Sequence, residues 1–434
     1  MAIGREGNVK WVDGLRGIAS ALVVLTHLCR AWDMDLFSSA DREHTAPRFL
    51  QWPYLRILIQ GRIGVTVFAF VTGYVCALKP IKLYKAGNQE AALISISKSA
   101  LRRSPRLFLP AAAATVVSFV ICEMGLYTIA KHADSWWIDA NSPARTPWLG
   151  EAVGRLVYNL VTTWTRKENN FDQNQWTLLP LLTGSMWVYA FIVATAYVKP
   201  RFRMLMSLGL CVYFWLSSDF TFGMQFFWGT LLADLQNSDT TAALIMSRPR
   251  TSAISSVILI FFGLTIASFP EGHAEWTTWS RVMLNMMRPI LPANPDYARF
   301  ASGIGLNFIT LGALLSPTLQ KLLSNRYLLF LGRMSFAVYL LHGTLMKTTL
   351  VWMLYGVQTL PDHEDSNGNM VMTRLRYPGH VSLIAWQIIW LPMLYGIANL
   401  WTTYVDPWCD RMTNKLVERV TFDGSEKISV LPVR

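Results

Sequence analysis

Long apolar blocks recur along the whole chain, with short polar segments between them. A helix needs about 20 mainly apolar residues to cross a bilayer. The pattern therefore predicts an all-α fold, a polytopic transmembrane helix bundle of about ten spans. The predicted spans are 17–32, 61–78, 107–126, 180–198, 204–217, 220–235, 253–269, 300–316, 334–354 and 381–402. The fifth and sixth spans are short and nearly adjacent, which predicts a tight helical hairpin.

Composition agrees with this pattern. Only 15% of the 434 residues are charged, whereas soluble domains carry about 25%. The chain is also rich in Trp, Tyr and Phe, which suit the two membrane interfaces. The net charge of +12 does not form one basic patch, because Lys and Arg cluster between the apolar blocks. Nucleic acid is therefore not an expected partner, whereas membrane lipid is.

The distribution of Lys and Arg also predicts the orientation. If the N-terminus is cytoplasmic, more than half of the 39 basic residues fall in cytoplasmic segments. This bias predicts that both termini lie in the cytoplasm. The membrane itself is expected to be the endoplasmic reticulum or the plasma membrane. The segment 403–434 then becomes a cytoplasmic tail. Segment 127–179 lies on the opposite side, either as a lid over a binding site or as a solvated connector.

The first apolar block contains a polar stripe. Arg16 and His27 are eleven residues apart, which corresponds to about 16 Å along a helix and nearly the same angular position. Asp13 and Ser20 share this stripe. A His deep in a membrane is a candidate functional residue, because an unpaired polar group there is costly. A helix-packing His that a neighbouring side chain satisfies is an equally good interpretation.

A basic cluster precedes the third span. Arg102, Arg103 and Arg106 fall within five residues at the predicted cytoplasmic face, and Pro105 favours a helix start there. Arginine guanidinium groups suit a phosphate-binding site, because each can donate two parallel hydrogen bonds to a phosphate. On this segment alone, a charge cluster that merely sets orientation is the more economical interpretation.

The ninth span carries a second polar stripe. Ser335, Tyr339 and His342 lie on one helical face, following Arg333 at the predicted cytoplasmic surface. Such a stripe usually faces the bundle interior, where it lines a polar site or hydrogen-bonds neighbouring helices. Both interpretations remain open for this stripe.

Four segments in the same order resemble the acyltransferase-3 family of polytopic membrane acyltransferases, in a fungal-type form. The first block reads WVDGLRGIASALVVLTHL and matches the family's Arg-x10-His opening through Arg16 and His27. The other three read GRIGVTVFAFVTGYV, RRSPRLFLP, with an Arg-x-x-Arg pair, and LGRMSFAVYLLHG. The resemblance implies that residues 1–402 form an acyltransferase-3-like membrane domain. It also implies transfer of an acyl group, commonly acetyl from acetyl-CoA, to a hydroxyl.

One segment departs from the family pattern. Fungal relatives usually carry WTLPVEFRGSM before the fourth span, and this chain has WTLLPLLTGSM. Trp176 and Ser185 remain, but Leu181 and Thr183 stand where Glu and Arg are expected. Asp172 is a nearby carboxylate that could substitute for the Glu.

These observations lead to a hypothesis for the chemistry. Arg102, Arg103 and Arg106, with Arg16, would bind the phosphates of acyl-CoA as co-substrate, and His27 would act as general base on a hydroxyl-bearing small molecule, lipid or glycan. Asp13 lies too near the cytoplasmic end to orient His27. No bound cofactor or metal is expected. The alternative is a non-catalytic transporter or flippase-like protein that uses the same polar residues to line a path.

Overall fold

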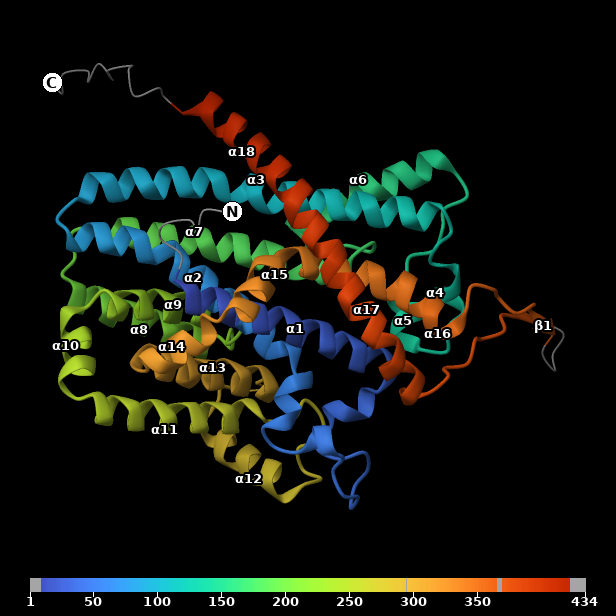
Figure 1. Cartoon of the computed structure of the whole chain (residues 1–434), viewed down its shortest axis with the longest axis horizontal. Helices are drawn as coiled ribbons and strands as arrows, with labels where there is room; N and C mark the ends of the chain where they lie inside the picture. Colours follow the sequence, from blue (N-terminus) through green and yellow to red (C-terminus); the bar gives the residue numbers. More distant parts are fainter. Residues whose placement is uncertain (1–8, 294, 365–368, 422–434) are drawn as a thin grey trace.

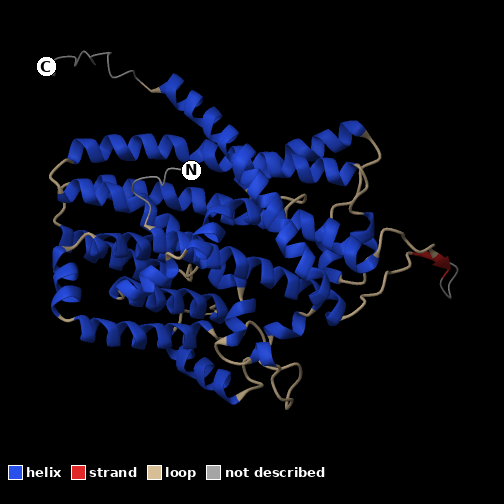
Figure 2. Cartoon of the chain, viewed as in Figure 1, coloured by secondary structure: helices blue, strands red, loops and turns tan. Residues whose placement is uncertain are grey.

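The computed structural model describes residues 9–293, 295–364 and 369–421 and is almost entirely helical (Figure 2). Short 3-10 and π segments carry the label η. In chain order the elements are α1 (Lys10–Trp32), η1 (Met34–Phe37), η2 (Phe49–Gln51), η3 (Leu55–Ile59), α2 (Gly61–Lys85), α3 (Gln89–Glu123), α4 (Thr128–His132), α5 (Trp136–Asn141), α6 (Leu149–Thr165), η4 (Gln173–Thr177), α7 (Leu178–Ala194), α8 (Pro200–Leu216), α9 (Gly223–Gln236), α10 (Asp239–Ser247), α11 (Pro249–Ala267), α12 (Thr278–Met287), η5 (Arg288–Ile290), α13 (Tyr297–Leu315), α14 (Pro317–Leu323), α15 (Arg326–Leu345), η6 (Met346–Leu350), α16 (Val351–Tyr355), β1 (His363–Glu364), β2 (Met370–Val371), α17 (His380–Leu400), η7 (Trp401–Val405) and α18 (Asp406–Val420). The two strands form a small antiparallel hairpin.

The predicted helix bundle is confirmed. Within the described residues, eight helices are long and apolar enough to cross a membrane. The two remaining predicted spans are α8, with 17 residues, and α9, with 14. They pack on each other as the predicted hairpin. Asp219 stabilises the start of α9, because its carboxylate accepts hydrogen bonds from the backbone N–H groups of Phe222 and Gly223 at 3.0 and 2.8 Å.

Most long helices run side by side between two ends of the bundle (Figure 1). We call the end where α1 begins the inner end, on the left of Figure 1, and the opposite one the outer end. α1 packs against both α2 and α15. Its first half belongs to one apolar cluster with α2 and α9, and its second half to another with α15 and α17. α1 therefore lies between two parts of the core.

Glycines allow α1 and α15 to approach closely near the inner end. A Cβ added to Gly332 would lie 2.1 Å from the carbonyl oxygen of Asp13, and one added to Gly17 would lie 2.6 Å from the backbone nitrogen of Gly332. No larger residue fits at either position without moving a helix. This contact fixes how the outer halves of α1 and α15 face each other.

One predicted helix start is wrong, and two other segments contain helices that the sequence pattern did not specify. α3 begins at Gln89, so Pro105 lies inside the helix rather than at its start. Asn88 caps this earlier start by accepting a hydrogen bond from the N–H of Ala91 at 3.1 Å. The segment 127–179 contains the α-helices α4 to α6 and the 3-10 helix η4. The helix of the last span continues into the predicted tail as far as Val420, and the rest of that tail, 422–434, lies outside the described residues.

Candidate functional site

The structure brings the two intramembrane histidines of the sequence analysis together. His27 Nδ1 on α1 lies 2.8 Å from His342 Nε2 on α15. The two rings are nearly parallel, with centroids 5.0 Å apart. His342 is fully buried, whereas His27 is partly exposed. Only His27 can therefore present a nitrogen to a substrate.

Backbone contacts of His342 determine where the protons lie on both rings. His342 Nδ1 is 2.9 Å from the carbonyl oxygens of Val338 and Tyr339. Carbonyl oxygens only accept, so Nδ1 carries the N–H of the neutral ring and Nε2 holds a lone pair. His27 must then donate its Nδ1–H to His342 Nε2. The Nε2 atom of His27 is left with an unprotonated lone pair, as a general base requires.

An aromatic side chain from the segment 127–179 covers the His27 ring. The ring centroid of Trp137 on α5 lies 5.5 Å from that of His27. α5 is fixed to the end of α1, because Ser135 Oγ donates a hydrogen bond to the carbonyl of Ala31. The half-buried indole shields one side of the imidazole from water.

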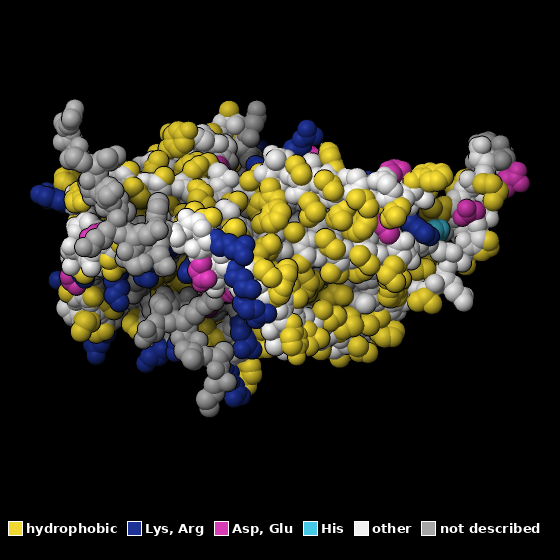
Figure 3. Space-filling view, turned by 90° about the horizontal axis from the view of Figure 1, so that it is seen from above, with side chains coloured by type: hydrophobic (Ala, Val, Ile, Leu, Met, Phe, Trp, Pro, Cys, Tyr) yellow, Lys and Arg dark blue, Asp and Glu magenta, His cyan; other side chains and the backbone are white. Residues whose placement is uncertain are grey.

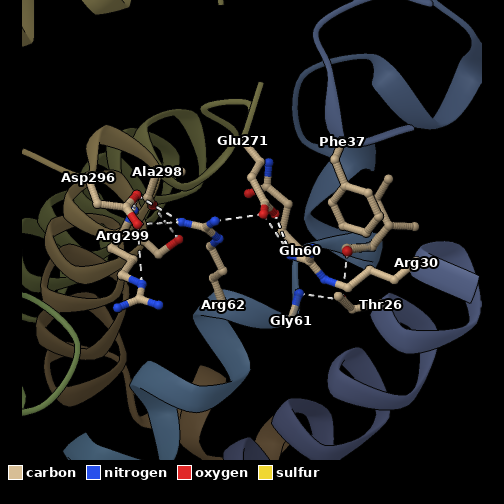
Figure 4. A network of polar contacts seen from close by, with 12 residues as sticks. Thr26, Arg30, Phe37, Gln60, Gly61, Arg62, Glu271, Asp296, Ala298 and Arg299 are labelled. Carbon is tan, nitrogen blue, oxygen red and sulfur yellow. Dashed lines mark hydrogen bonds and ion pairs between the residues drawn. The ribbon is translucent and has the colours of Figure 1, made fainter. Parts of the chain in front are cut away.

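A network of charged residues lies beyond His27 at the outer end (Figure 4). Glu271 accepts hydrogen bonds from Arg30 at 2.7 Å and Arg62 at 2.6 Å, and Arg62 also pairs with Asp296 at 2.8 Å. Burial alone would raise the pKa of Glu271, but the hydrogen bonds from the two guanidiniums reverse this and lower its pKa. The network ties the segment around Glu271 to α1 and α2.

Two arginines meet near the inner end. Arg16 donates to the carbonyl of Gly332 at 2.8 Å and pairs with Asp13 at 3.4 Å. Arg103 donates to Thr72 Oγ1 at 3.2 Å. The positive charge of Arg103 opposes that of Arg16 electrostatically. The Nε atoms of both are buried and lack a hydrogen-bond partner among the described residues. Two adjacent cations with unused donors form a candidate anion site.

The other two arginines of the cluster point elsewhere. Arg102 is exposed. Arg106 is also exposed and pairs with Asp410 of α18, Nε to Oδ1, at 3.0 Å. The sequence groups the three arginines as one cluster, but in the structure Arg103 is half-buried beside Thr72 whereas Arg102 and Arg106 are exposed, because a helix turns neighbouring side chains to different faces.

Comparison with known proteins agrees with the order of these groups along the chain. The family described as "Acyltransferase domain" matches residues 9–405, nearly the whole chain. The chain belongs to the acyltransferase-3 family. It is 28% identical to the O-acetyltransferase PaAT-1 of Phomopsis amygdali, over 79% of this chain and 73% of that protein. It is 22% identical to the acyltransferase clz18 of Cochliobolus lunatus, over 77% of this chain and 82% of that protein. It is also 22% identical to the acyltransferase R4 of a Phoma species, over 78% of this chain and 83% of that protein. No solved structure matches the chain.

Family membership confirms the predicted enzyme class, an acyltransferase embedded in a membrane. In this acyltransferase, several of the predicted site residues make structural contacts within or between helices and do not contact the histidine pair. Ser335 Oγ donates to the carbonyl of Gly332 at 2.8 Å, and Ser185 Oγ donates to that of Leu182 at 2.6 Å. Trp176 packs edge-on against Phe222, with centroids 5.8 Å apart. None of these contacts joins the histidine pair.

Tyr339 holds η4 beside the histidine pair of the acyltransferase. Its hydroxyl hydrogen-bonds Thr177 Oγ1 at 2.7 Å and also contacts the carbonyl of Asn174. Gly343, directly after His342, leaves room for η4, because a Cβ there would lie 2.3 Å from Asn174 Nδ2 and 3.4 Å from Asp172 Oδ1. Tyr339 and Gly343 therefore position the turn of α15 that carries His342.

The position of the expected glutamate is apolar in this acyltransferase. Leu181 packs against the apolar cluster shared by α2 and α9. Asp172, the possible substitute, is buried and accepts hydrogen bonds from the N–H of Asn174 and from Gln175 Nε2, both at 3.3 Å. Burial raises the pKa of the Asp172 carboxyl to about 6, although Lys347 and Gln175 oppose this shift. Asp172 contacts the turn after His342, and its contacts support the fold of η4.

Sequence reasoning missed two residues beside this site. Trp137 lies in a loop segment with several tryptophans, and nothing in the pattern distinguishes it. Lys347 is a buried lysine whose Nζ donates to the carbonyls of Asn141 and Phe171 at 3.0 and 3.2 Å. A single Lys inside an apolar span is a signal that could have found it.

Proposed function

We propose that this acyltransferase moves an acetyl group from acetyl-CoA to a hydroxyl of a small molecule, lipid or sugar. The hydrogen-bonded pair of His27 and His342 carries the proposal, because it leaves His27 Nε2 as an available base. The similarity to a protein named O-acetyltransferase supports both the acetyl group and the oxygen acceptor.

In this mechanism His27 Nε2 removes the proton of the acceptor hydroxyl as its oxygen attacks the thioester carbonyl. The new C–O bond forms, the C–S bond breaks, and the proton passes from His27 to the departing CoA sulfur. While His27 carries two protons, its Nδ1–H stays hydrogen-bonded to His342 Nε2. His342 is thus a positioning residue that fixes the tautomer and orientation of the base.

Arg16 and Arg103 are the proposed contacts for the CoA phosphates. Both have a buried Nε–H that lacks a hydrogen-bond partner among the described residues, so a phosphate oxygen would satisfy these donors. The eleven residues from Arg16 to His27 span about 16 Å of helix, which an extended pantetheine arm can follow toward the base. Arg106 contributes less, since it already pairs with Asp410.

The proposed orientation places the inner end, with both arginines, in the cytoplasm, where acyl-CoA is available. The bias of Lys and Arg toward segments at this end supports that orientation in the endoplasmic reticulum or the plasma membrane. The acceptor then meets the acetyl group near Trp137, on the outer side of His27.

The decisive experiment incubates the purified acyltransferase with radiolabelled acetyl-CoA and a panel of hydroxyl-bearing acceptors. Labelled ester should form with the parent chain, and His27→Ala should lower its rate by about 10²- to 10⁴-fold. Size-exclusion chromatography in detergent verifies that the variant is folded. Full activity of a folded His27→Ala protein would exclude the mechanism.

A further inference from the structure

The last helix, α18, differs sharply in character from α17, which precedes it. α17 has no Asp, Glu, Lys or Arg in its 21 residues, whereas α18 has six in 15. The continuous helix from His380 to Val420 contains 41 residues and is about 60 Å long, roughly twice the thickness of the hydrocarbon layer. Because six of the 15 residues of α18 are charged, this end of the helix leaves the hydrocarbon layer or lies in its interface.

α18 has one buried stripe that fixes it to the bundle. Cys409, Thr413 and Val417 recur every four residues and are buried. The helix packs on α3, and the ion pair between Asp410 and Arg106 joins the same two helices. α18 is thus held against the middle of α3, which it crosses in Figure 1.

A second stripe is apolar and exposed. Its four side chains also recur every four residues and are 38 to 62% exposed: Trp408, Met412, Leu416 and Val420. At 100° per residue, this stripe borders the buried one. Four aligned apolar side chains beside a membrane bundle need an apolar environment.

A third stripe is basic and borders the apolar stripe on its other side. Arg411, Lys415 and Arg419 are all exposed, and Asn414 and Glu418 complete the circumference. Figure 3 shows Lys and Arg side chains gathered in a column at the edge of a large apolar surface. An apolar stripe next to a basic stripe is typical of helices that lie in a membrane interface.

We propose that α18 is an interfacial helix that inserts its apolar stripe between lipids and binds the phosphates of anionic phospholipids through Arg411, Lys415 and Arg419. The order of the stripes supports this partner, because the apolar residues face the lipid beside α3 while the basic ones reach headgroup level. This inference stands independently of the acetyl-transfer mechanism.

The first test measures the depth of α18 in the membrane. Spin labels are attached to Leu416→Cys and, as a matched position, Asn414→Cys, in the full chain in nanodiscs of phosphatidylcholine and phosphatidylserine. The label at 416 should collide more with oxygen than with a water-soluble nickel chelate, and the label at 414 should show the reverse. The unsubstituted chain gives the background from its five native cysteines. Equal accessibility at both positions would overturn the insertion of the apolar stripe.

The second test measures headgroup binding. Native mass spectrometry measures how much phosphatidylserine each protein retains. The parent is compared with a triple variant that carries Arg411→Gln, Lys415→Gln and Arg419→Gln. The control is a double variant with Arg248→Gln and Arg250→Gln, which removes exposed charge elsewhere. Each charge removed from α18 should weaken retention about fivefold, and the control should match the parent. Equal retention by the triple variant would overturn the anionic-lipid site, whatever the depth measurement gives.

Discussion

His27 and His342 lie 315 positions apart in the sequence, yet their ring nitrogens share a hydrogen bond of 2.8 Å. The carbonyls of Val338 and Tyr339 fix the proton on the far nitrogen of His342 and so select the tautomer of His27. The base thus depends on a residue that contacts no substrate. This relationship gives the clearest prediction for the mechanism.

His342→Leu removes the acceptor for the Nδ1–H of His27, so kcat should fall about 100-fold while KM for acetyl-CoA changes little. His342→Gln offers a carbonyl oxygen to the same N–H and should recover part of the lost kcat. Steady-state kinetics on both purified variants provide the check. Equal kcat values for the Leu and Gln variants would argue against tautomer control.

Arg103 and Arg102 are neighbours that the structure assigns to different environments. Arg103→Ala should raise KM for acetyl-CoA about 10- to 100-fold, because one charged hydrogen-bond donor to phosphate is lost. Arg102→Ala is the matched control and should leave this KM nearly unchanged, because Arg102 is exposed. KM for the acceptor should change little in either variant. Similar donor KM values in the two variants would contradict the site at Arg16 and Arg103.

Gly332 allows the close contact between α1 and α15. Gly332→Ala places a Cβ 2.1 Å from the Asp13 carbonyl and should lower stability by about 1–3 kcal/mol, with reduced activity because the two histidines move apart. Gly154→Ala on α6 serves as the control, since nothing lies within 4 Å of its Cβ position. Thermal unfolding in detergent measures both. An unchanged melting temperature for Gly332→Ala would show that the helices are farther apart than described.

Glu271 predicts a pH dependence of stability. The pKa of Glu271 is lower in the folded protein than in the unfolded chain, where it is about 4.3. The ion pairs of Glu271 therefore stabilise the fold at pH values above the unfolded pKa. This contribution is lost as the pH falls through the pKa of the folded state. Glu271→Gln should lower stability by about 2 kcal/mol at pH 7, and the difference from the parent should shrink in acid. Thermal unfolding between pH 7 and pH 3 checks this. Glu151→Gln, at an exposed position on α6, is the control. A difference that stays constant with pH would contradict the role of the network.

The sequence determined the architecture and the enzyme class. Apolar blocks of sufficient length predict membrane helices wherever they occur, because no other element satisfies its backbone hydrogen bonds within one segment in lipid. Each of the ten predicted spans lies in a helix to within a few residues. The motifs that contain Arg16, His27 and His342 also indicated the acyltransferase family, and the match over residues 9–405 confirms it.

Only the tertiary structure decided which of these residues meet. Helical periodicity places a side chain on a face, but it says nothing about which helix that face contacts. The histidine pair, the contact of Arg103 with Thr72, and the packing of Trp137 on His27 all arise from contacts between distant segments. The packing of α1 on α15 through Gly17 and Gly332 controls the approach of the two histidines, and such packing depends on the shapes of both helices at once.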